Sequence, residues 1–255
     1  MATYRGGMSL FDRILAASDV KRTMVSPEEA LAGRDTPMSV PTEHLVLHHP
    51  LRGETDGDGA HGAEDGAHGA AGIGTWPAGL RAVVLAGGCF WGFEEIFWQL
   101  PGVYSTAVGY AGGYTPNPTY EEVCTARTGH AEAVLVVYDP SELSFDSLMA
   151  TFYTSHDPTQ EMRQGNDIGT QYRSAVFAFA DDEVRTAVET ARRFEPVLRE
   201  AGYGPVTSEI ALMSDAGDGR FYYAEPYHQQ YLFTNPNGYR CHATTGLTVP
   251  AGDGD

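Results

Sequence analysis

The sequence predicts an α/β fold in which helices cover a mixed β-sheet, as a two-layer sandwich. Apolar segments of strand length alternate with helical segments along the chain. The connections between strands differ in length and include hairpin-like turns, which favours a mixed sheet over a doubly wound parallel sheet. A chain of 255 residues is long enough for one sizeable core or at most two small ones. No Gly-x-Gly-x-x-Gly motif follows a strand and no Walker loop is present, so the sequence gives no support for nucleotide binding.

The segment around Cys89 contains the first expected strand and helix. Residues 82–86 are apolar and β-branched, as is typical of a buried strand. The following segment has the spacing of one apolar helical face, formed by Phe93, Ile96, Phe97 and Leu100. Cys89 thus lies where a strand turns into a helix, and we expect unpaired N–H groups and the helix dipole to lower the pKa of its thiol. This position predicts a nucleophilic thiolate, and a buried, inert cysteine is the structural alternative.

The remaining elements follow from apolar periodicity and turn residues. Strands are expected at residues 103–111, 131–138, 174–179 and 206–212, and helices at residues 144–153, 182–199 and 227–232. Residues 156–171 are polar, contain glycine and are too long for a simple connector, which indicates a functional loop.

The chain divides into four parts. We expect residues 1–51 to form an irregular N-terminal arm with one short helix from Ser26 to Gly33. Residues 52–75 contain a repeat of Asp-Gly-Ala-His-Gly-Ala with almost nothing apolar, which predicts a disordered linker. Residues 76–250 form the globular domain and residues 251–255 a disordered tail.

Charge and cysteine content limit the classes of partner. The net charge is −18 and Lys21 is the only lysine, which argues against nucleic acid and anionic membranes as partners. No apolar run approaches the length of a membrane span, and we recognise no secretory signal. Three cysteines are too few for a disulfide-stapled secreted fold. We therefore expect a cytoplasmic protein with one or two working thiols.

Five blocks between Val83 and Cys241 are informative because they occur together. They are Gly88-Cys89-Phe90-Trp91-Gly92, Gly129-His130-Ala131-Glu132-Ala133-Val134, Gln164-Gly165-Asn166-Asp167, Gly169-Thr170-Gln171-Tyr172-Arg173-Ser174 and His228-Gln229-Gln230-Tyr231-Leu232. In this order they resemble the peptide methionine sulfoxide reductase A family (MsrA). Residues 8–38 also resemble the N-terminal arm of some bacterial members. We expect the sandwich of such a protein to have a ferredoxin-like core.

The chemistry of such an enzyme requires a nucleophile and an acid. A thiolate attacks the sulfoxide sulfur, and the oxygen must be protonated or hydrogen-bonded as it leaves. Cys89 is the expected nucleophile. Glu132 matches the acid of the family, and burial on its apolar strand should raise its pKa and keep it protonated. The structural alternative for Glu132 is a strand-end carboxylate that points to water.

Other site residues are implied by the resemblance alone. Tyr120 and Tyr172 match the two tyrosines that hold the sulfoxide oxygen, although most tyrosines are half-buried packing residues. Phe90 and Trp91 would form the apolar wall for the terminal methyl group of the substrate. Asp167 matches an aspartate that orients groups near the site, and a loop cap is its structural alternative.

Attack would leave a sulfenic acid on Cys89, which a second thiol can convert to a disulfide. By resemblance that thiol is Cys241, and no cysteine follows it in the chain. This favours direct reduction of the disulfide by a thioredoxin-like partner over a three-cysteine relay. Cys124 precedes the Glu132 strand, and we expect it to be buried and inert.

The predicted enzyme is a monomer that reduces methionine-S-sulfoxide, free or in proteins, to methionine and so repairs oxidative damage. It needs no cofactor or metal. A thiol peroxidase would share the cysteines but would not need Glu132. A zinc-stabilised binding module with Cys89, Cys124, Cys241 and His242 has the wrong ligand spacing for a structural zinc site.

Overall fold

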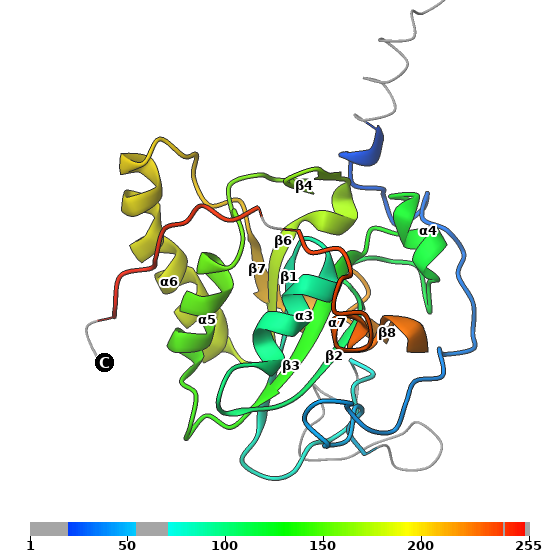
Figure 1. Ribbon diagram of the computed structural model, residues 1–255. Helices are drawn as coiled ribbons and strands as arrows, with labels where there is room; N and C mark the ends of the chain where they lie inside the picture. The colour runs from blue at the N-terminus through cyan, green and yellow to red at the C-terminus, as the bar shows by residue number, and fades with distance from the viewer. Residues whose placement is uncertain (1–19, 55–70, 242, 253–255) are drawn as a thin grey trace, which may run out of the picture.

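The computed structural model describes residues 20–54, 71–241 and 243–252. Its centre is one six-stranded sheet with the strand order β7-β6-β1-β3-β2-β8 (Figure 1). The strands are β1 (Arg81–Gly87), β2 (Val103–Ala111), β3 (Ala131–Tyr138), β6 (Ser174–Ala178), β7 (Glu209–Leu212) and β8 (Phe221–Tyr223). Neighbouring strands are antiparallel except for β6 and β7, which are parallel. The mixed α/β sheet predicted from the sequence is therefore confirmed.

Three helices cover one face of this sheet. They are α3 (Phe90–Trp98), α5 (Phe145–Thr154) and α6 (Asp181–Glu200). Alternate residues of β1 face opposite sides, so Val83 and Leu85 pack into the same core as the apolar faces of these helices. Burial of these aromatic and aliphatic side chains holds α3 rigidly against the sheet.

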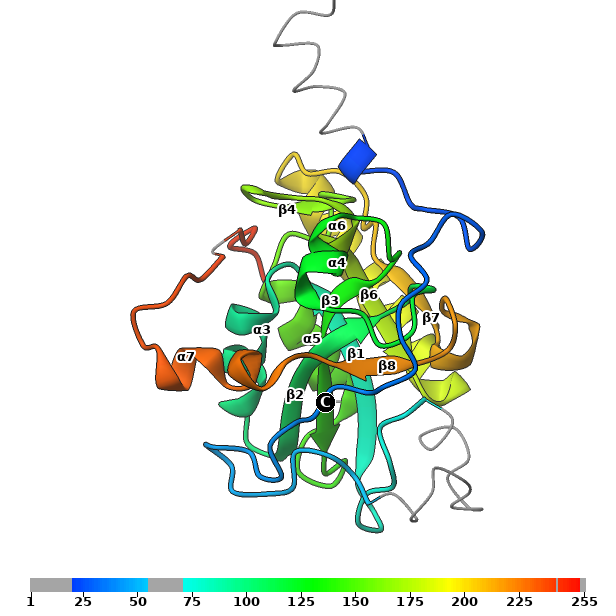
Figure 2. The same cartoon turned by 90° about the vertical axis from the view of Figure 1, so that its right-hand side faces the viewer.

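Irregular segments from the N-terminal part of the chain cover the opposite face. Leu51 and Ile73 are fully buried there, against Val84, Leu135 and Phe177 of the sheet. Figure 2 shows the N-terminal arm in blue, which runs down this side of the molecule past β8. The apolar residues of this arm thus complete the core instead of remaining outside it.

The predicted linker is too long at both ends. Gly53 N–H donates to Ile73 O at 3.1 Å, and Glu54 pairs with Thr75 in an antiparallel bridge. Residues 52–54 and 71–75 are thereby part of the fold, because Ile73 supplies an apolar side chain that the composition of the repeat conceals. The disorder predicted for residues 55–70 and 253–255 concerns residues outside the described part of the chain.

Several short elements also differ from the prediction. The expected helix from Ser26 to Gly33 is a single turn, in which Ser26 O accepts from the N–H groups of Glu29 and Ala30. The expected helix at 227–232 is broken by Gln230, which has a φ of 47°. It divides into the 3₁₀ turn η3 (Pro226–His228) and the helix α7 (Tyr231–Thr234).

The polar stretch 156–171 carries local structure. It contains the hairpin of β4 (Arg163–Gln164) and β5 (Asp167–Ile168), followed by the 3₁₀ turn η1 (Thr170–Tyr172). A helix that the sequence analysis missed, α4 (Tyr120–Cys124), begins at the capping box of Thr119 and Glu122. These elements surround the end of the sheet at which Cys89 lies.

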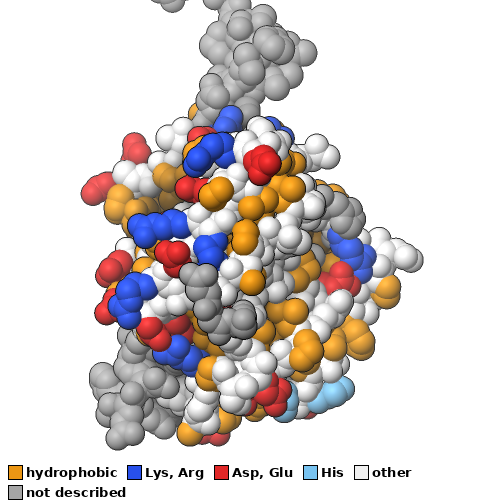
Figure 3. All heavy atoms as spheres, turned by 90° about the vertical axis from the view of Figure 1, so that its left-hand side faces the viewer, with side chains coloured by type: hydrophobic (Ala, Val, Ile, Leu, Met, Phe, Trp, Pro, Cys, Tyr) orange, Lys and Arg blue, Asp and Glu red, His pale blue; other side chains and the backbone are white. Residues whose placement is uncertain are grey.

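None of the helices in the described ranges is both long and apolar enough to cross a membrane. On the face shown in Figure 3, arginine side chains lie close to acidic ones and form no separate basic surface. The partly buried pair of Arg193 with Asp146, at 2.6 Å, is one such contact.

Candidate active site

Cys89 lies between β1 and α3, at the N-cap of the helix. Gly88 precedes it with a φ of 104°, a conformation that favours glycine. A Cβ atom at Gly88 would also lie 2.8 Å from Cγ of Gln164, so a larger residue would displace the β4–β5 hairpin. Cys89 is partly exposed. Cys89 is therefore held at the start of a rigid helix, with part of the residue exposed.

The electrostatics of Cys89 differ from the prediction. Burial raises the pKa of its thiol above the ordinary value, and the negative charges of Glu132 and Asp167 act in the same direction. The N–H groups of Trp91 and Gly92 lower the pKa, as expected at a helix N-terminus, but they do not compensate. The expected lowering of the pKa is wrong for the resting protein, in which Cys89 is a neutral thiol.

Glu132 lies on β3 and is 1% exposed. Its Oε2 accepts a hydrogen bond of 3.1 Å from the N–H of Phe90, the residue that follows Cys89. Its Oε1 is buried with no hydrogen-bond partner among the described residues. Burial, with the charge of Asp167 as a smaller cause, raises the pKa of Glu132 to about 8. A protonated carboxyl group is thus placed beside the cysteine with one oxygen free.

Aromatic rings form the apolar side of the site. The Phe90 ring contacts those of Trp91, Tyr120 and His228, with ring centroids 5.1–6.4 Å apart. Trp91 stacks on Tyr231 at 3.9 Å and donates its Nε1–H to Nδ1 of His228 at 2.9 Å. His228 accepts at Nδ1, and burial lowers its pKa to about 4, so it is neutral and fixes the Trp91 ring.

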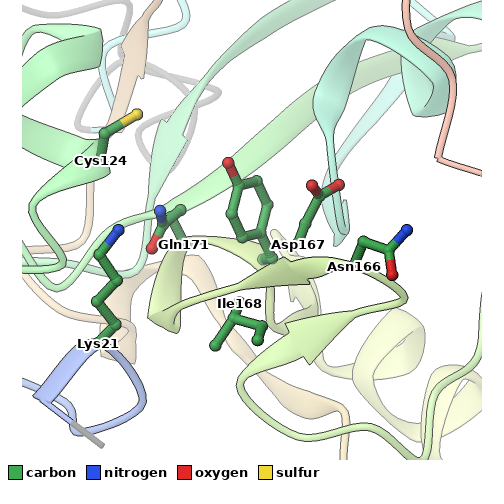
Figure 4. Close-up of a pocket in the computed structure, with 7 residues that line it drawn as sticks. Lys21, Cys124, Asn166, Asp167, Ile168 and Gln171 are labelled. Carbon is green, nitrogen blue, oxygen red and sulfur yellow. The ribbon is translucent and has the colours of Figure 1, made fainter. Parts of the chain in front are cut away.

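A cleft of about 480 Å³ lies on the polar side of the site (Figure 4). Its lining comprises Lys21, Cys124, Asn166, Asp167, Ile168, Gln171 and Tyr172. Tyr172 interacts electrostatically with Glu132, Tyr120, Cys124 and Asp167, so its hydroxyl group lies among the predicted site residues. Tyr120 is hydrogen-bonded to Cys124, which is partly exposed at the cleft. The expectation that Cys124 is buried is therefore wrong, because α4 turns it toward the cleft.

The C-terminal tail brings Cys241 to the same region; in Figure 1 it is the red segment that runs from α7 towards α6. Cys241 Sγ donates to Gln164 O at 3.5 Å, and a Cβ atom at Gly92 would lie 4.0 Å from Cys241 N. The tail therefore crosses the first turn of α3, and Gln164 lies next to both Cys241 and Gly88, the residue before Cys89.

Two contacts of neighbouring residues dock the tail. Tyr239 donates its hydroxyl hydrogen to Oδ2 of Asp167 at 3.1 Å. Arg240 forms a bidentate ion pair with Glu95 of α3, with N–O distances of 2.6 and 2.7 Å. The structure thus brings all eight predicted site residues into one region around the N-terminus of α3.

Comparison with known proteins places this geometry in a family. Residues 81–250 match the family described as peptide methionine sulfoxide reductase. A relative from Corynebacterium kroppenstedtii named "Peptide methionine sulfoxide reductase MsrA" is 52% identical over 88% of this chain and 93% of its own length. The chain belongs to the peptide methionine sulfoxide reductase family. This confirms both the resemblance and the enzyme class expected from the sequence.

Two solved structures agree with the membership of this chain in the reductase family. Methionine sulfoxide reductase A of Corynebacterium diphtheriae superposes with a TM-score of 0.73 at 40% identity, and the match covers 90% of this chain and all of that one. The reduced form of Mxr1 from Saccharomyces cerevisiae gives a TM-score of 0.60 at 34% identity over 66% of this chain and 94% of its own. The match to the Corynebacterium diphtheriae structure therefore covers more of this chain than the match to the yeast structure.

A buried polar network behind the reductase site was not predicted. His44 accepts N–H groups of the arm at Nδ1, so its Nε2–H donates to Oγ1 of Thr106 at 2.8 Å, and Thr106 donates to Oε1 of Glu94 at 3.1 Å. Glu94 also accepts from the backbone N–H of Gln230 at 2.9 Å and from its side chain at 2.7 Å. The network ties the arm, β2, α3 and the segment that carries His228 together. In the sequence, only the position of Glu94, a charged residue on an otherwise apolar helix, indicates this network.

No group of three or more histidine, cysteine or acidic residues within the described ranges has a geometry suited to a metal ion. Cys89 and Cys124 both interact electrostatically with Tyr120. The side chains gathered at the family site include thiols, a carboxyl group and tyrosine hydroxyls.

Proposed function

We propose that this enzyme reduces methionine-S-sulfoxide, free or in peptides and proteins, to methionine. The single observation that carries the proposal is the Glu132 carboxyl group. It is buried, has one oxygen without a partner, and binds the N–H of the residue after a partly exposed cysteine. A carboxyl group with a pKa near 8 in an apolar wall suits protonation of a neutral S=O oxygen. The names of the relatives support the same reaction.

The first half-reaction transfers the sulfoxide oxygen to Cys89. Its Sγ attacks the substrate sulfur while Glu132 donates a proton to the oxygen, and Tyr120 and Tyr172 donate hydrogen bonds to it. The thiol proton of Cys89 provides the second proton, so that the oxygen leaves as water. Addition of water to the Cys89 sulfur displaces methionine and forms the sulfenic acid; one proton returns to Glu132 and the other hydrogen stays on the sulfenic acid oxygen. Phe90 and Trp91 enclose the methyl group, and Asp167 orients the polar side.

The second half-reaction restores the thiol. Cys241 attacks the Cys89 sulfenic acid, which forms a disulfide and releases water. A dithiol partner of the thioredoxin class then reduces the disulfide by exchange and becomes oxidised itself. We propose that the enzyme acts as a cytoplasmic monomer in the repair of oxidised methionine, without a cofactor or metal. The strand order β6-β1-β3-β2 and the helix crossing between β1 and β2 support a ferredoxin-like core.

The test is a single turnover with methionine-S-sulfoxide in the absence of reductant. Cys89→Ser should release no methionine, because a serine hydroxyl is a poor nucleophile at this position. Cys241→Ser should release one methionine per enzyme and retain a sulfenic acid that a dimedone probe traps on Cys89. With thioredoxin present, that variant should not cycle.

Cys124→Ser is the matched control, because Cys124 lies at the same cleft. It should retain both single turnover and cycling. Methionine release by Cys89→Ser would reject the proposed nucleophile. Turnover of hydrogen peroxide in preference to methionine sulfoxide would indicate a thiol peroxidase instead.

A further inference from the structure

We infer that Lys21 recognises the α-carboxylate of the substrate, so that the enzyme favours methionine sulfoxide with a free carboxyl group over an internal residue of a chain. The inference rests on the proposed function and adds a specificity-determining residue to it. Lys21 is the only lysine among 255 residues, and the N-terminal arm places it in the lining of the cleft with Asp167 and Tyr172.

The Lys21 side chain is exposed and directed inward. In Figure 4 its ammonium group points toward Cys124 and the amide of Gln171, from the side of the cleft opposite Asn166. Its charge acts on the cleft, since it lowers the pKa of Cys124 against the larger effect of burial. No hydrogen bond or ion pair joins the ammonium group to another residue in the described part of the chain.

Three arginines close to the site in the fold are already paired with carboxylates. Arg22 pairs with Glu161 at 3.5 Å, Arg34 with Glu122 at 2.9 Å, and Arg240 with Glu95 at 2.6 Å. Lys21 is thus a cation that the fold leaves available at the cleft. An ammonium group in such a position is suited to a small anion such as a carboxylate.

Substrate chemistry places a carboxylate at this end of the cleft. Glu132 and the Tyr172 hydroxyl take the sulfoxide, and Tyr172 also interacts with Cys124, next to Lys21. With the sulfoxide oxygen at Glu132 and the methyl group at Phe90 and Trp91, as proposed above, the remaining substituent of the sulfur, which carries the α-carbon, extends toward the polar cleft. An anionic substrate is repelled by the net charge of −18 and by Asp167, and Lys21 offsets this repulsion locally.

The experiment compares two substrates that differ only in this charge. N-acetyl-methionine-S-sulfoxide carries the carboxylate, and its N-methylamide is neutral and resembles a residue within a chain. Lys21→Gln should raise KM for the carboxylate substrate about two- to five-fold, the range of a solvent-exposed ion pair. It should leave kcat for that substrate and KM for the amide substrate unchanged. Lys21→Arg should retain the wild-type preference. Added salt should narrow the difference in KM for the carboxylate between the wild type and Lys21→Gln, because it screens the ion pair in the wild type alone and the repulsion by the net charge in both.

Arg22→Gln is the matched control, because it removes the same charge from the adjacent residue, which is paired with Glu161 outside the cleft lining. It should leave the preference intact. Equal effects of Arg22→Gln and Lys21→Gln on KM would show that the positive charge acts through a long-range field and not through contact with the carboxylate. That result would overturn the inference. A Lys21→Gln variant with unchanged selectivity would overturn it as well. The proposed function itself would fail only if the wild type reduced neither substrate.

Discussion

Glu132 is the residue on which the proposed chemistry depends. Its carboxyl group has a single hydrogen bond, from Phe90 N–H, and burial raises its pKa to about 8. Glu132→Gln keeps the shape and can keep that bond, but the amide cannot donate a proton to an oxyanion as an acid does. We expect single-turnover methionine release to slow by about 10²–10⁴-fold, the usual range for general acid assistance.

The pH dependence gives a second readout of the same residue. Wild-type single-turnover rates should fall above about pH 8, as Glu132 ionises. The Glu132→Gln rate should lack this limb. Glu121→Gln, an exposed carboxylate on α4, is the control and should keep both the rate and the limb. A normal rate in Glu132→Gln would assign the proton to another donor.

Individual site residues could be predicted because their chemistry shows in local sequence. Cys89 at a strand–helix junction and Glu132 on an apolar strand were both visible, and the raised pKa of Glu132 was expected from that strand. The raised pKa of Cys89 was not, because desolvation depends on the tertiary neighbours that enclose the thiol. The position of Lys21 in the cleft depends on the path of an irregular arm, which has no periodicity to read.

At the scale of elements, the tail is held over α3 by side chains that flank Cys241. The ion pair of Arg240 with Glu95 is bidentate and partly buried, and it fixes the tail above the first turn of the helix. Docking of this kind keeps the effective concentration of the Cys241 thiol near Cys89 high. Glu95→Gln should therefore slow disulfide formation several-fold and leave the release of methionine in a single turnover unchanged.

The measurement follows free thiols and methionine in parallel after one addition of substrate. Sulfenic acid should accumulate in Glu95→Gln before the disulfide forms. Glu189→Gln, which disturbs only the exposed pair with Arg192 on α6, is the control and should behave as the wild type. Faster disulfide formation in Glu95→Gln would show instead that docking holds Cys241 away from Cys89.

Long elements were predictable and short ones were not. The helix α6 and the strands β1 and β3 have enough apolar periodicity to identify them. The segment 227–232 was instead predicted as one helix but is broken at Gln230, whose left-handed conformation is held by the hydrogen bonds to Glu94. The helix therefore breaks because of a contact with Glu94, which is distant in the sequence, and the local sequence does not indicate this contact.

At the scale of the whole molecule, the buried carboxyl groups and the buried histidines have opposite effects on the pH dependence of stability. Burial raises the pKa of Glu94 to about 7 and that of Glu132 to about 8, from an ordinary value of 4.5. Both carboxyl groups therefore contribute stability below pH 4.5 that is lost as the pH rises through 7 and 8. Burial lowers the pKa of four histidines to about 4, namely His44, His130, His156 and His228. Their contribution is present above their ordinary value of 6.5 and is lost as the pH falls toward 4.

The two windows overlap between pH 4.5 and 6.5, where the four histidines outweigh the two carboxyl groups, so these groups together predict a stability maximum near pH 6.5. Above pH 7 the protonation of the histidines no longer changes; that of the two carboxyl groups does, and toward pH 9 the thiols with raised pKa values, such as Cys89, act in the same direction. From pH 7 to pH 9 the free energy of unfolding should fall by an amount on the order of 1 kcal/mol. Urea unfolding at a series of pH values, at constant ionic strength, measures this fall.

Glu132→Gln separates this effect from general repulsion in a chain with a net charge of −18. The glutamine does not ionise, so the decrease above pH 7 should become smaller by the share of Glu132, whereas repulsion between surface carboxylates is unchanged. Glu121→Gln removes an exposed carboxylate, the same charge that Glu132 carries once it has ionised, and should keep the wild-type slope. Parallel curves for the wild type and Glu132→Gln would mean that Glu132 ionises at the same pH folded and unfolded. A carboxyl group without a raised pKa could not hold the proton that the sulfoxide oxygen requires.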